Sequence, residues 1–213
     1  MTVAIMGGTF NPVHYGHLRV AEEVRELLNV DKIIFIPAFN PPHKDDDSFI
    51  SSEHRIEMVR LAIEDNPSFE VSDREIRRGG ASYSVETLRE MADEEGGEEI
   101  HFIVGADSFN EITTWHKYKE IFTLANIIVV PRPGYRFKRV EEALPVAEAR
   151  SFWYDEARDI YSNKYGRFVK FMETTPMGIS SSTIREVVKR GGSTRYLIPP
   201  AVEGYIEREH LYR

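Results

Sequence analysis

The sequence predicts an α/β protein built on a doubly wound parallel sheet. Continuous apolar runs at residues 2–6, 32–37, 100–105 and 126–131 are typical of strands that are buried on both faces. Between them, apolar residues recur every three to four positions, which is the period of amphipathic helices. Strands that alternate with such helices favour a parallel sheet with helices on both faces. Ligands of these sheets bind beyond the carboxyl ends of the strands, so the polar segments after the strands are the candidates for function.

The length of 213 residues favours one domain, or one domain with a subdomain, and we predict a single domain over residues 1–213. Ser84 is a candidate helix N-cap, because apolar residues at helical spacing follow it. Residues 136–163 are charged, aromatic and poorly periodic, and they predict no element. Residues 180–213 are expected to form a C-terminal helical portion. We expect helices over 18–28, 51–65, 84–92 and 180–190, helical pieces over 107–124, strands over 69–72 and 168–172, and a final helix from Pro199 or Pro200 to the C-terminus.

Composition excludes several classes of function. The net charge of −8 argues against a general nucleic-acid-binding protein, whose surface would be basic. The absence of cysteine excludes disulfides, thiolate nucleophiles and cysteine-ligated zinc. No apolar run approaches the ~20 residues of a membrane span, and the N-terminus does not resemble a signal peptide. We therefore expect a cytoplasmic protein with no nucleic-acid or membrane partner.

The first polar segment follows the first strand and reads GGTFNPVHYGH, residues 7–17. Gly7 and Gly8 allow the backbone to approach a ligand where a Cβ would clash. The segment leads into a helix, and the unpaired N–H groups and positive dipole of a helix start favour phosphate. His14 and His17 are one helical turn apart, so both can face the same side and donate hydrogen bonds to phosphate oxygens.

A glycine pair or a single His-x-x-His pair also occurs in purely structural roles, but here the two come in a defined order. The segment resembles the (H/T)xGH signature of the nucleotidyltransferase α/β-phosphodiesterase superfamily. Neither rival phosphate motif, GxxxxGK[ST] or GxGxxG after a strand, is present.

The second polar segment, GISSSTIR, covers residues 178–185 and begins a helix. Its hydroxyls and helix-start N–H groups suit phosphate, and Arg185 adds a charge-assisted contact. The structural alternative is a heavily capped helix with a solvent-exposed arginine. The segment resembles the ISSTxIR signature of bacterial nicotinate mononucleotide adenylyltransferases, with Ser182 in place of threonine, so a hydroxyl is retained.

The resemblance extends along most of the chain but not over residues 136–163. Asn11 departs from the commoner aspartate of the GGTFDP pattern, and Ser84 from the threonine of SYT. A neutral amide can still cap the turn at residue 11. The further matches are PPHK at residues 41–44, SYS with Thr87 and Leu88 at 82–88, GADS at 105–108 with Trp115, RPG at 132–134 and the ending LYR at 211–213.

This resemblance implies a Rossmann-like nucleotidyltransferase fold and a set of site residues. Structural alternatives exist for four of them: a solvated loop position for Lys44, partial core burial for Trp115, a helix cap for Asp107 and a surface turn for Arg132. The implied catalytic residues are His14, His17, Lys44 and Arg185. The implied ATP-binding residues are Gly8, Thr9, Phe10, His14, His17, Gly105, Asp107, Ile179, Ser181, Ser182 and Arg185. The implied mononucleotide-binding residues are Lys44, Tyr83, Ser84, Trp115 and Arg132.

The implied reaction transfers AMP from ATP to nicotinate mononucleotide, and it releases pyrophosphate and forms nicotinate adenine dinucleotide, an intermediate of NAD synthesis. Mg²⁺ is expected to enter with ATP and to keep several waters, so no metal site made of protein side chains is expected. Two alternatives stay open, an adenylyltransferase of the phosphopantetheine type and an ATP-binding module without turnover. The preference for nicotinate over nicotinamide mononucleotide, the metal used in the cell and homo-oligomerisation also stay open.

Overall fold

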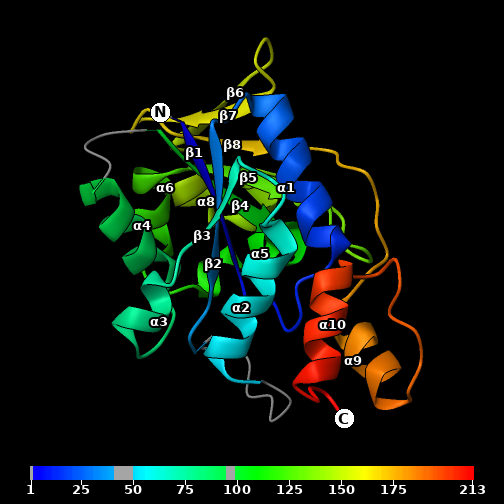
Figure 1. The fold of residues 1–213 in the computed structure, drawn as a ribbon. Coiled ribbons are helices and arrows are strands. Elements are labelled where there is room, and N and C mark those ends of the chain that lie inside the picture. Colours follow the sequence, from blue (N-terminus) through cyan, green and yellow to red (C-terminus); the bar gives the residue numbers. More distant parts are fainter. Residues whose placement is uncertain (1, 41–49, 95–98) are drawn as a thin grey trace. The chain divides into compact units, whose positions relative to one another are not determined.

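A computed structural model describes residues 2–40, 50–94 and 99–213 (Figure 1). The chain divides into two compact units. The first unit comprises Met1–Met6 and Tyr83–Pro176, and the second comprises Gly7–Ser82 and Met177–Arg213. A single nucleotidyltransferase domain over residues 1–213 stays a prediction.

Four parallel strands form the centre of the first unit, in the order β1, β4, β5 and β8. One row of their core crosses all four strands, because Ile5 pairs with Phe102, Phe102 with Ile127, and Ile127 with Val169. All four side chains are buried. The predicted strands are thus confirmed as β1 (Val3–Gly8), β4 (Ile100–Gly105), β5 (Asn126–Val130) and β8 (Phe168–Phe171).

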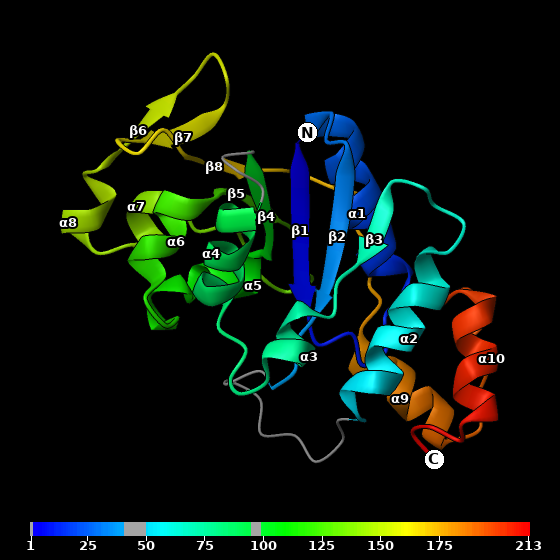
Figure 2. The same cartoon turned by 60° about the vertical axis from the view of Figure 1, so that its left-hand side comes forward.

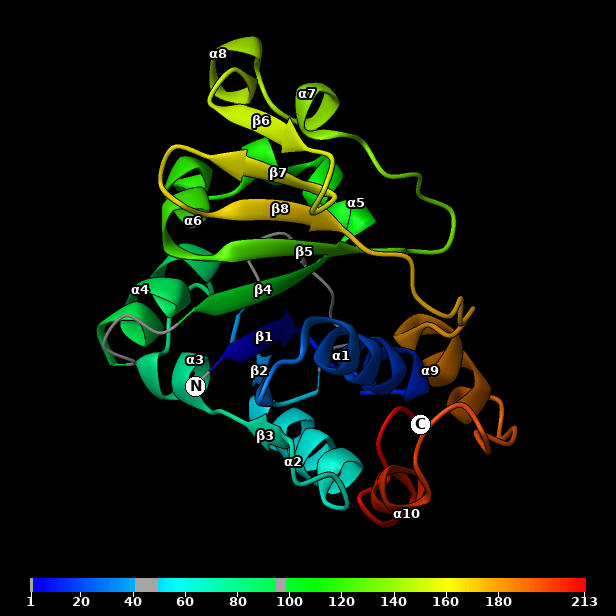
Figure 3. The ribbon, with the colours of Figure 1, turned by 90° about the horizontal axis from the view of Figure 1, so that it is seen from above.

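The sheet of the first unit is not parallel throughout. Strands β6 (Phe152–Asp155) and β7 (Ile160–Asn163) pair antiparallel, and β7 also pairs antiparallel with β8 (Figure 3). These two strands lie in the segment for which the sequence predicts no element. Each is only four residues long. Such short strands with charged and aromatic residues carry little of the periodicity on which sequence prediction depends.

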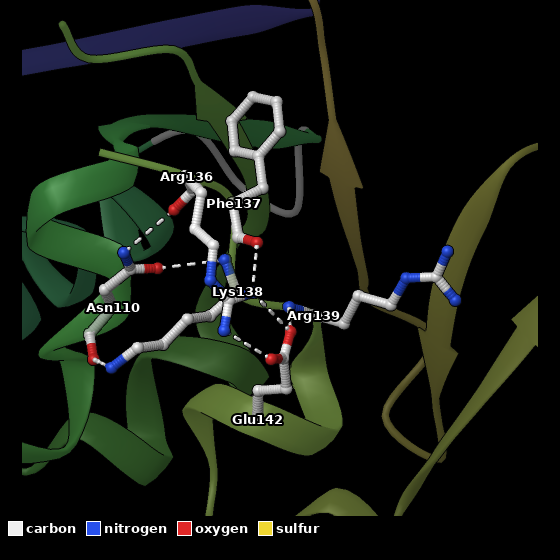
Figure 4. Close-up of polar contacts among 6 residues, drawn as sticks. All are labelled: Asn110, Arg136, Phe137, Lys138, Arg139 and Glu142. Atoms are coloured by element: carbon white, nitrogen blue, oxygen red, sulfur yellow. Dashed lines mark hydrogen bonds and ion pairs between the residues drawn. The ribbon is translucent and has the colours of Figure 1, made fainter. Parts of the chain in front are cut away.

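Polar contacts rather than apolar periodicity hold the start of that segment (Figure 4). The Asn110 amide donates to the Arg136 carbonyl oxygen at 3.0 Å and accepts from the Lys138 N–H at 3.1 Å. The Arg136 guanidinium forms a bidentate pair with Glu142 at 2.7 and 3.1 Å. Glu142 also accepts from the Arg139 N–H. The hydrogen bonds from Arg136 are the main cause that lowers the pKa of Glu142 to about 2.

The helices of the first unit within residues 84–124 agree with the predictions, whereas two short helices lie in residues 136–163, for which the sequence predicts no element. One detail differs, because the Tyr83 carbonyl oxygen accepts from the Glu86 N–H at 3.0 Å, so Tyr83 rather than Ser84 is the capping position. The helices are α4 (Ser84–Glu94), α5 (Ala106–Asn110), the 3₁₀ helix η1 (Ile112–Thr114), α6 (Tyr118–Leu124), α7 (Val140–Ala143) and α8 (Val146–Ala149).

In the second unit, strands β2 (Lys32–Pro37) and β3 (Phe69–Val71) pair in parallel. Helix α2 (Ser52–Ile63) packs on both strands, and α10 (Pro200–Arg208) packs against α2 (Figure 2). The predicted final helix was too long, since α10 ends at Arg208 and five residues follow it. The unit also contains α1 (Tyr15–Leu28), the unpredicted short helix α3 (Arg74–Arg78) and α9 (Ser181–Lys189). Among the described residues, no helix is long and apolar enough to cross a membrane.

His101 in β4 predicts a pH dependence of stability. Its side chain is buried, and burial, together with the charge of Arg167, lowers its pKa, while Glu99 acts in the opposite direction. Because the pKa of His101 is lower in the folded protein, neutral His101 contributes its full stabilisation above the unfolded-state pKa of about 6.5. This stabilisation is lost as the pH falls through the folded-state pKa. We expect the free energy of unfolding to decrease as the pH falls below about 6.5. Urea titrations across this range measure it.

The matched variants are His101→Gln, which removes the buried titrating group, and His210→Gln, which removes an exposed one. The acid-dependent loss should shrink in His101→Gln and persist in His210→Gln. Identical pH profiles for the parent and His101→Gln would exclude this role of His101.

Candidate active site

The segment after β1 forms a loop that is fixed by aromatic packing. A Cβ at Gly8 would lie only 3.0 Å from the Phe10 ring, tighter than an ordinary contact, so glycine favours this close approach. Phe10 is buried and has a φ of +49°, a conformation that L-residues rarely adopt. Its ring packs edge-on against His17 and at a tilt against Phe35, with centroid distances of 5.1 and 5.8 Å. The surrounding rings therefore hold the strained backbone in place. We call residues 7–12 the phosphate loop.

The two predicted histidines come together at the start of α1. Their rings stack with centroids 3.7 Å apart, which confirms that they lie on the same side of the helix. His14 is the N-cap, and its N–H donates to Nδ1 of His17 at 3.3 Å. Because Nδ1 of His17 accepts this bond, a neutral His17 carries its proton on Nε2. His17 is thus set up as a hydrogen-bond donor through Nε2.

The start of α9 contacts the phosphate loop through side chains. The Ser181 hydroxyl donates to the Pro12 carbonyl oxygen at 2.8 Å, and Nη1 of Arg185 donates to the Asn11 carbonyl oxygen at 3.0 Å. The Ser180 hydroxyl caps the helix by accepting from the Thr183 N–H at 3.1 Å. Arg185 is therefore not simply a solvent-exposed arginine. The second unit brings two helix starts, those of α1 and α9, to one loop.

Tyr212 is a residue of this site that sequence reasoning missed, apart from noting the familiar ending. Its hydroxyl donates to Oδ1 of the buried Asn11 at 2.8 Å. Burial raises the pKa of this phenol, although the charges of Arg185 and Arg55 oppose the shift. The hydroxyl therefore stays protonated and remains a donor at neutral pH. The phosphate loop is thus held from the C-terminal end of the chain as well.

Tyr212→Phe removes this donor from a buried amide oxygen. A buried hydrogen bond of this kind contributes about 1 kcal/mol, which corresponds to a decrease in Tm of roughly 2–4 °C in a protein of this size. Thermal unfolding followed by circular dichroism measures the change. Tyr196→Phe is the matched control, because Tyr196 is 89% exposed in the same unit. An unchanged Tm for Tyr212→Phe would show that the bond adds no stability.

A second group of predicted residues lies at the end of β4 in the first unit. A Cβ at Gly105 would lie 2.5 Å from Oδ1 of Asp107, so glycine lets this carboxylate fold back over the start of α5. Oδ2 of Asp107 lies 3.6 Å from Nε of Arg132. Arg132 is exposed and belongs to a tight turn, in which the Tyr135 N–H donates to its carbonyl oxygen. This pair therefore presents one carboxylate and one guanidinium side by side.

Aromatic side chains form the remaining part of the first-unit site. The Tyr83 ring lies 4.4 Å from the His116 ring at an interplanar angle of 31°. Trp115, next in the chain, is partly exposed, and its ring packs edge-on against the buried Phe102 at 6.2 Å. His116 was not predicted as a site residue. Its only signal in the sequence is its position beside Trp115.

The structure thus sorts the predicted residues into two sets, each within one unit. The second-unit set consists of three loop residues, Gly8, Thr9 and Phe10, and of the residues around that loop, His14, His17, Ser181 and Arg185. The Ile179 carbonyl oxygen lies near Gly16, 3.8 Å from the position that a Cβ on Gly16 would occupy. Ser182 is exposed, and its hydroxyl is hydrogen-bonded to that of Ser180. Lys44 lies outside the described residues. The first-unit set comprises Tyr83, Ser84, Gly105, Asp107, Trp115 and Arg132.

The donor set of the phosphate loop suits an anion. It consists of imidazole, hydroxyl and guanidinium groups together with two helix starts, all of which can donate hydrogen bonds. In the described part of the chain, no three His, Asp or Glu side chains are grouped so that they could hold a metal ion. The groups that contact the loop are thus hydrogen-bond donors, and phosphate oxygens are hydrogen-bond acceptors.

Sequence comparison connects this site to known proteins. Residues 5–187 match the family model described as cytidylyltransferase-like. A protein of Geobacter sp. (strain M21), named "Probable nicotinate-nucleotide adenylyltransferase", is 51% identical over 212 residues, which cover 100% of this chain and 98% of that protein. A protein of Trichlorobacter lovleyi with the same name is 43% identical over the full length of both chains.

Structural comparison agrees on the fold. The chain superposes on the Plasmodium falciparum nicotinic acid mononucleotide adenylyltransferase complexed with NaAD with a TM-score of 0.73, covering 99% of this chain and 97% of that one. At 17% sequence identity this similarity concerns the fold alone, and it confirms the predicted nucleotidyltransferase fold. The family model, the full-length relatives and the phosphate loop lead to one conclusion: the chain belongs to the cytidylyltransferase-like family, among the nicotinate-nucleotide adenylyltransferases.

Proposed function

We propose that the chain transfers AMP from ATP to nicotinate mononucleotide, forming nicotinate adenine dinucleotide and pyrophosphate. The observation that carries the proposal is the phosphate loop, to which Ser181 and Arg185 of α9 are bonded at Pro12 and Asn11. In this proposal the starts of two helices and the two stacked histidines bind one anionic group, the phosphates of ATP. The full-length relatives named for this activity support the choice of reaction.

The reaction that we propose is a direct in-line displacement. An oxygen of the 5′-phosphate of nicotinate mononucleotide attacks the α-phosphorus of ATP and forms a new P–O bond. The bond from that phosphorus to the α,β-bridging oxygen breaks, and its electron pair leaves with pyrophosphate. Such a displacement requires only that the two substrates are positioned and that charge is stabilised, as in other phosphoryl-transfer enzymes.

In this proposal the second unit supplies the donors for the ATP phosphates. Nε2 of His17 donates to a phosphate oxygen, because Nδ1 is occupied by the His14 N–H. Arg185 adds a positive charge beside the loop, and its bond to Asn11 sets the direction of its guanidinium. Such groups act most strongly on the charge that develops in the transition state. Gly8, Thr9, Phe10, Ile179, Ser181 and Ser182 complete the proposed set.

The first unit supplies the proposed contacts to the mononucleotide. The flat indole of Trp115 is the proposed stacking surface for the pyridine ring. Tyr83 and Ser84 are the proposed donors to the nicotinate carboxylate, and Arg132 and Lys44 the proposed phosphate contacts. Gly105 and Asp107 belong instead to the proposed ATP-binding set: the Asp107 carboxylate suits a ribose hydroxyl, and Gly105 leaves room for it.

ATP is proposed to enter as its Mg²⁺ complex. The donors around the phosphate loop are cationic or neutral, which fits an ion held mainly by phosphate oxygens and water rather than by carboxylates. Bound in this way, Mg²⁺ neutralises part of the triphosphate charge. A cytoplasmic location is part of the proposal, and homo-oligomerisation stays open.

Release of pyrophosphate with ATP and Mg²⁺ tests the proposed function. Nicotinate mononucleotide, nicotinamide mononucleotide and phosphopantetheine are compared side by side. We expect rapid release with the nicotinate form and at least ~10-fold slower release with the amide, about 1.4 kcal/mol of discrimination. Turnover with phosphopantetheine alone would retain the phosphate loop and overturn the acceptor. If pyrophosphate is released with none of the three acceptors, the proposed reaction is overturned and an ATP-binding module without turnover is favoured.

A further inference from the structure

Arg55 is a buried cation on α2 that the proposed reaction does not use. Its side chain is 3% exposed, and its guanidinium donates to four backbone carbonyl oxygens. Nη1 reaches both Thr9, at 2.9 Å, and Ala38, at 2.5 Å. Nη2 reaches Phe39 at 3.2 Å, and Nε reaches Ile50 at 3.3 Å. One side chain therefore joins the phosphate loop, the end of β2 and the residue before Ser51, the N-cap of α2.

Burying a guanidinium is unfavourable unless its donors are satisfied. Burial indeed lowers the pKa of Arg55, while Tyr212, Glu53 and Glu75 oppose the shift. An apolar side chain would fill the same space without this cost. What the arginine adds is direction, because its rigid fork fixes the orientation of several carbonyl groups at once.

The orientation of the Thr9 carbonyl decides where the next N–H points. In a trans peptide the C=O and the following N–H point in opposite directions, and the Thr9–Phe10 bond is trans. Because the Thr9 oxygen faces Arg55, the Phe10 N–H points away from Arg55. In the same way, the Gly8 oxygen accepts from the Ala38 N–H at 2.8 Å, which turns the Thr9 N–H away from β2.

We propose that Arg55 is a positioning residue for ATP: it orients the Thr9 and Phe10 backbone donors of the phosphate loop without contacting substrate. The inference rests on the proposed function, in which this loop holds the ATP phosphates. It also accounts for the strained Phe10, since the carbonyl that precedes it is anchored from the opposite side. Arg55 thus holds this glycine-containing loop in its binding conformation before ATP arrives, which reduces the conformational entropy that is lost on binding.

The experiment compares Arg55→Lys and Arg55→Met with Arg60→Lys. Arg60 is the matched control, because it lies on the same helix, is 57% exposed and pairs with Glu57. Calorimetry measures binding of a non-hydrolysable ATP analogue and of nicotinate mononucleotide separately. We expect Arg55→Lys to weaken the ATP analogue by ~10-fold, Arg55→Met to weaken it further, and both to leave nicotinate mononucleotide within about twofold. Arg60→Lys should match the parent for both ligands.

A purely structural role predicts something different. It would lower the Tm and the fraction of folded protein, while the folded fraction would bind ATP with the parent affinity. Unchanged analogue affinity in Arg55→Lys, or equal weakening of both ligands, would overturn the proposal. Parent activity with nicotinate mononucleotide, measured in the same series, tests the proposed function separately, so the two failures are distinguishable.

If neither Arg55 variant folds, nuclear magnetic resonance of the parent enzyme gives the second test. The guanidinium N–H signals of Arg55 should be protected from exchange before ligand is added, because their four acceptors are already in place. Adding the ATP analogue should shift these signals, and adding nicotinate mononucleotide alone should not. Rapidly exchanging or unresponsive signals would overturn the proposal.

Discussion

His17→Ala is expected to lower kcat by about 10²-fold or more, the effect of removing one donor to the transition state. The physical reason is that Nδ1 of His17 accepts from the His14 N–H, so in the neutral ring Nε2 is the nitrogen that carries the proton and can donate. The ring is also held in place by stacking on His14 and by the edge contact with Phe10. A donor held in this way needs no reorganisation when charge develops on the phosphates.

The measurement is the steady-state rate of pyrophosphate release at saturating substrates. His17→Gln is the informative companion, because its side-chain amide can replace the Nε2 donor and should recover part of the rate. His210→Ala, which removes an exposed histidine, is the control. A His17→Ala rate within a factor of two of the parent would remove His17 from the mechanism.

Trp115→Ala is expected to weaken nicotinate mononucleotide selectively. Stacking of a base on an aromatic side chain contributes about 1–3 kcal/mol, so the KM for the mononucleotide should rise by roughly 5- to 150-fold. The KM for ATP should change by less than about threefold, because the proposed ATP phosphate contacts at the phosphate loop do not involve this indole. Both constants are obtained from initial rates with the other substrate saturating.

Trp115 also packs on Phe102, so lost packing must be separated from lost stacking. Trp115→Phe keeps an aromatic face and should retain most of the mononucleotide affinity. Trp115→Leu keeps apolar volume without a ring and should behave like alanine toward the mononucleotide. Equal weakening of ATP and mononucleotide in Trp115→Ala would exclude the stacking role.

Much of the fold could be predicted because it depends on local patterns. The buried strands β1, β2, β4 and β5 are continuous apolar runs, and their residues pair in rows such as Ile5 with Phe102. The hairpin of β6 and β7 could not be predicted, because its strands are short and the preceding turn is held by contacts of Asn110 and Glu142. Contacts of this kind leave no periodic signal in the sequence.

The candidate site divides in the same way. The spacing of His14 and His17 within one helical turn predicted that both can face the same side, and in the structure their rings stack. Tyr212 and Arg55 gave no such signal. Tyr212 bonds to Asn11 across 201 residues of chain, and Arg55 bonds to Thr9 across 46. Neither pairing can be inferred from spacing.

By itself, the sequence determined the α/β class, the order of the main elements and the two motifs that we propose to bind phosphate. These features depend on residue type and on short-range geometry, which the local sequence sets independently of contacts with distant parts of the chain. Only the tertiary structure decided which carbonyl groups those motifs contact, as in the bonds of Ser181 to Pro12 and of Arg185 to Asn11. The direction of a peptide group in a loop is set by distant partners, and these meet only when the chain has folded.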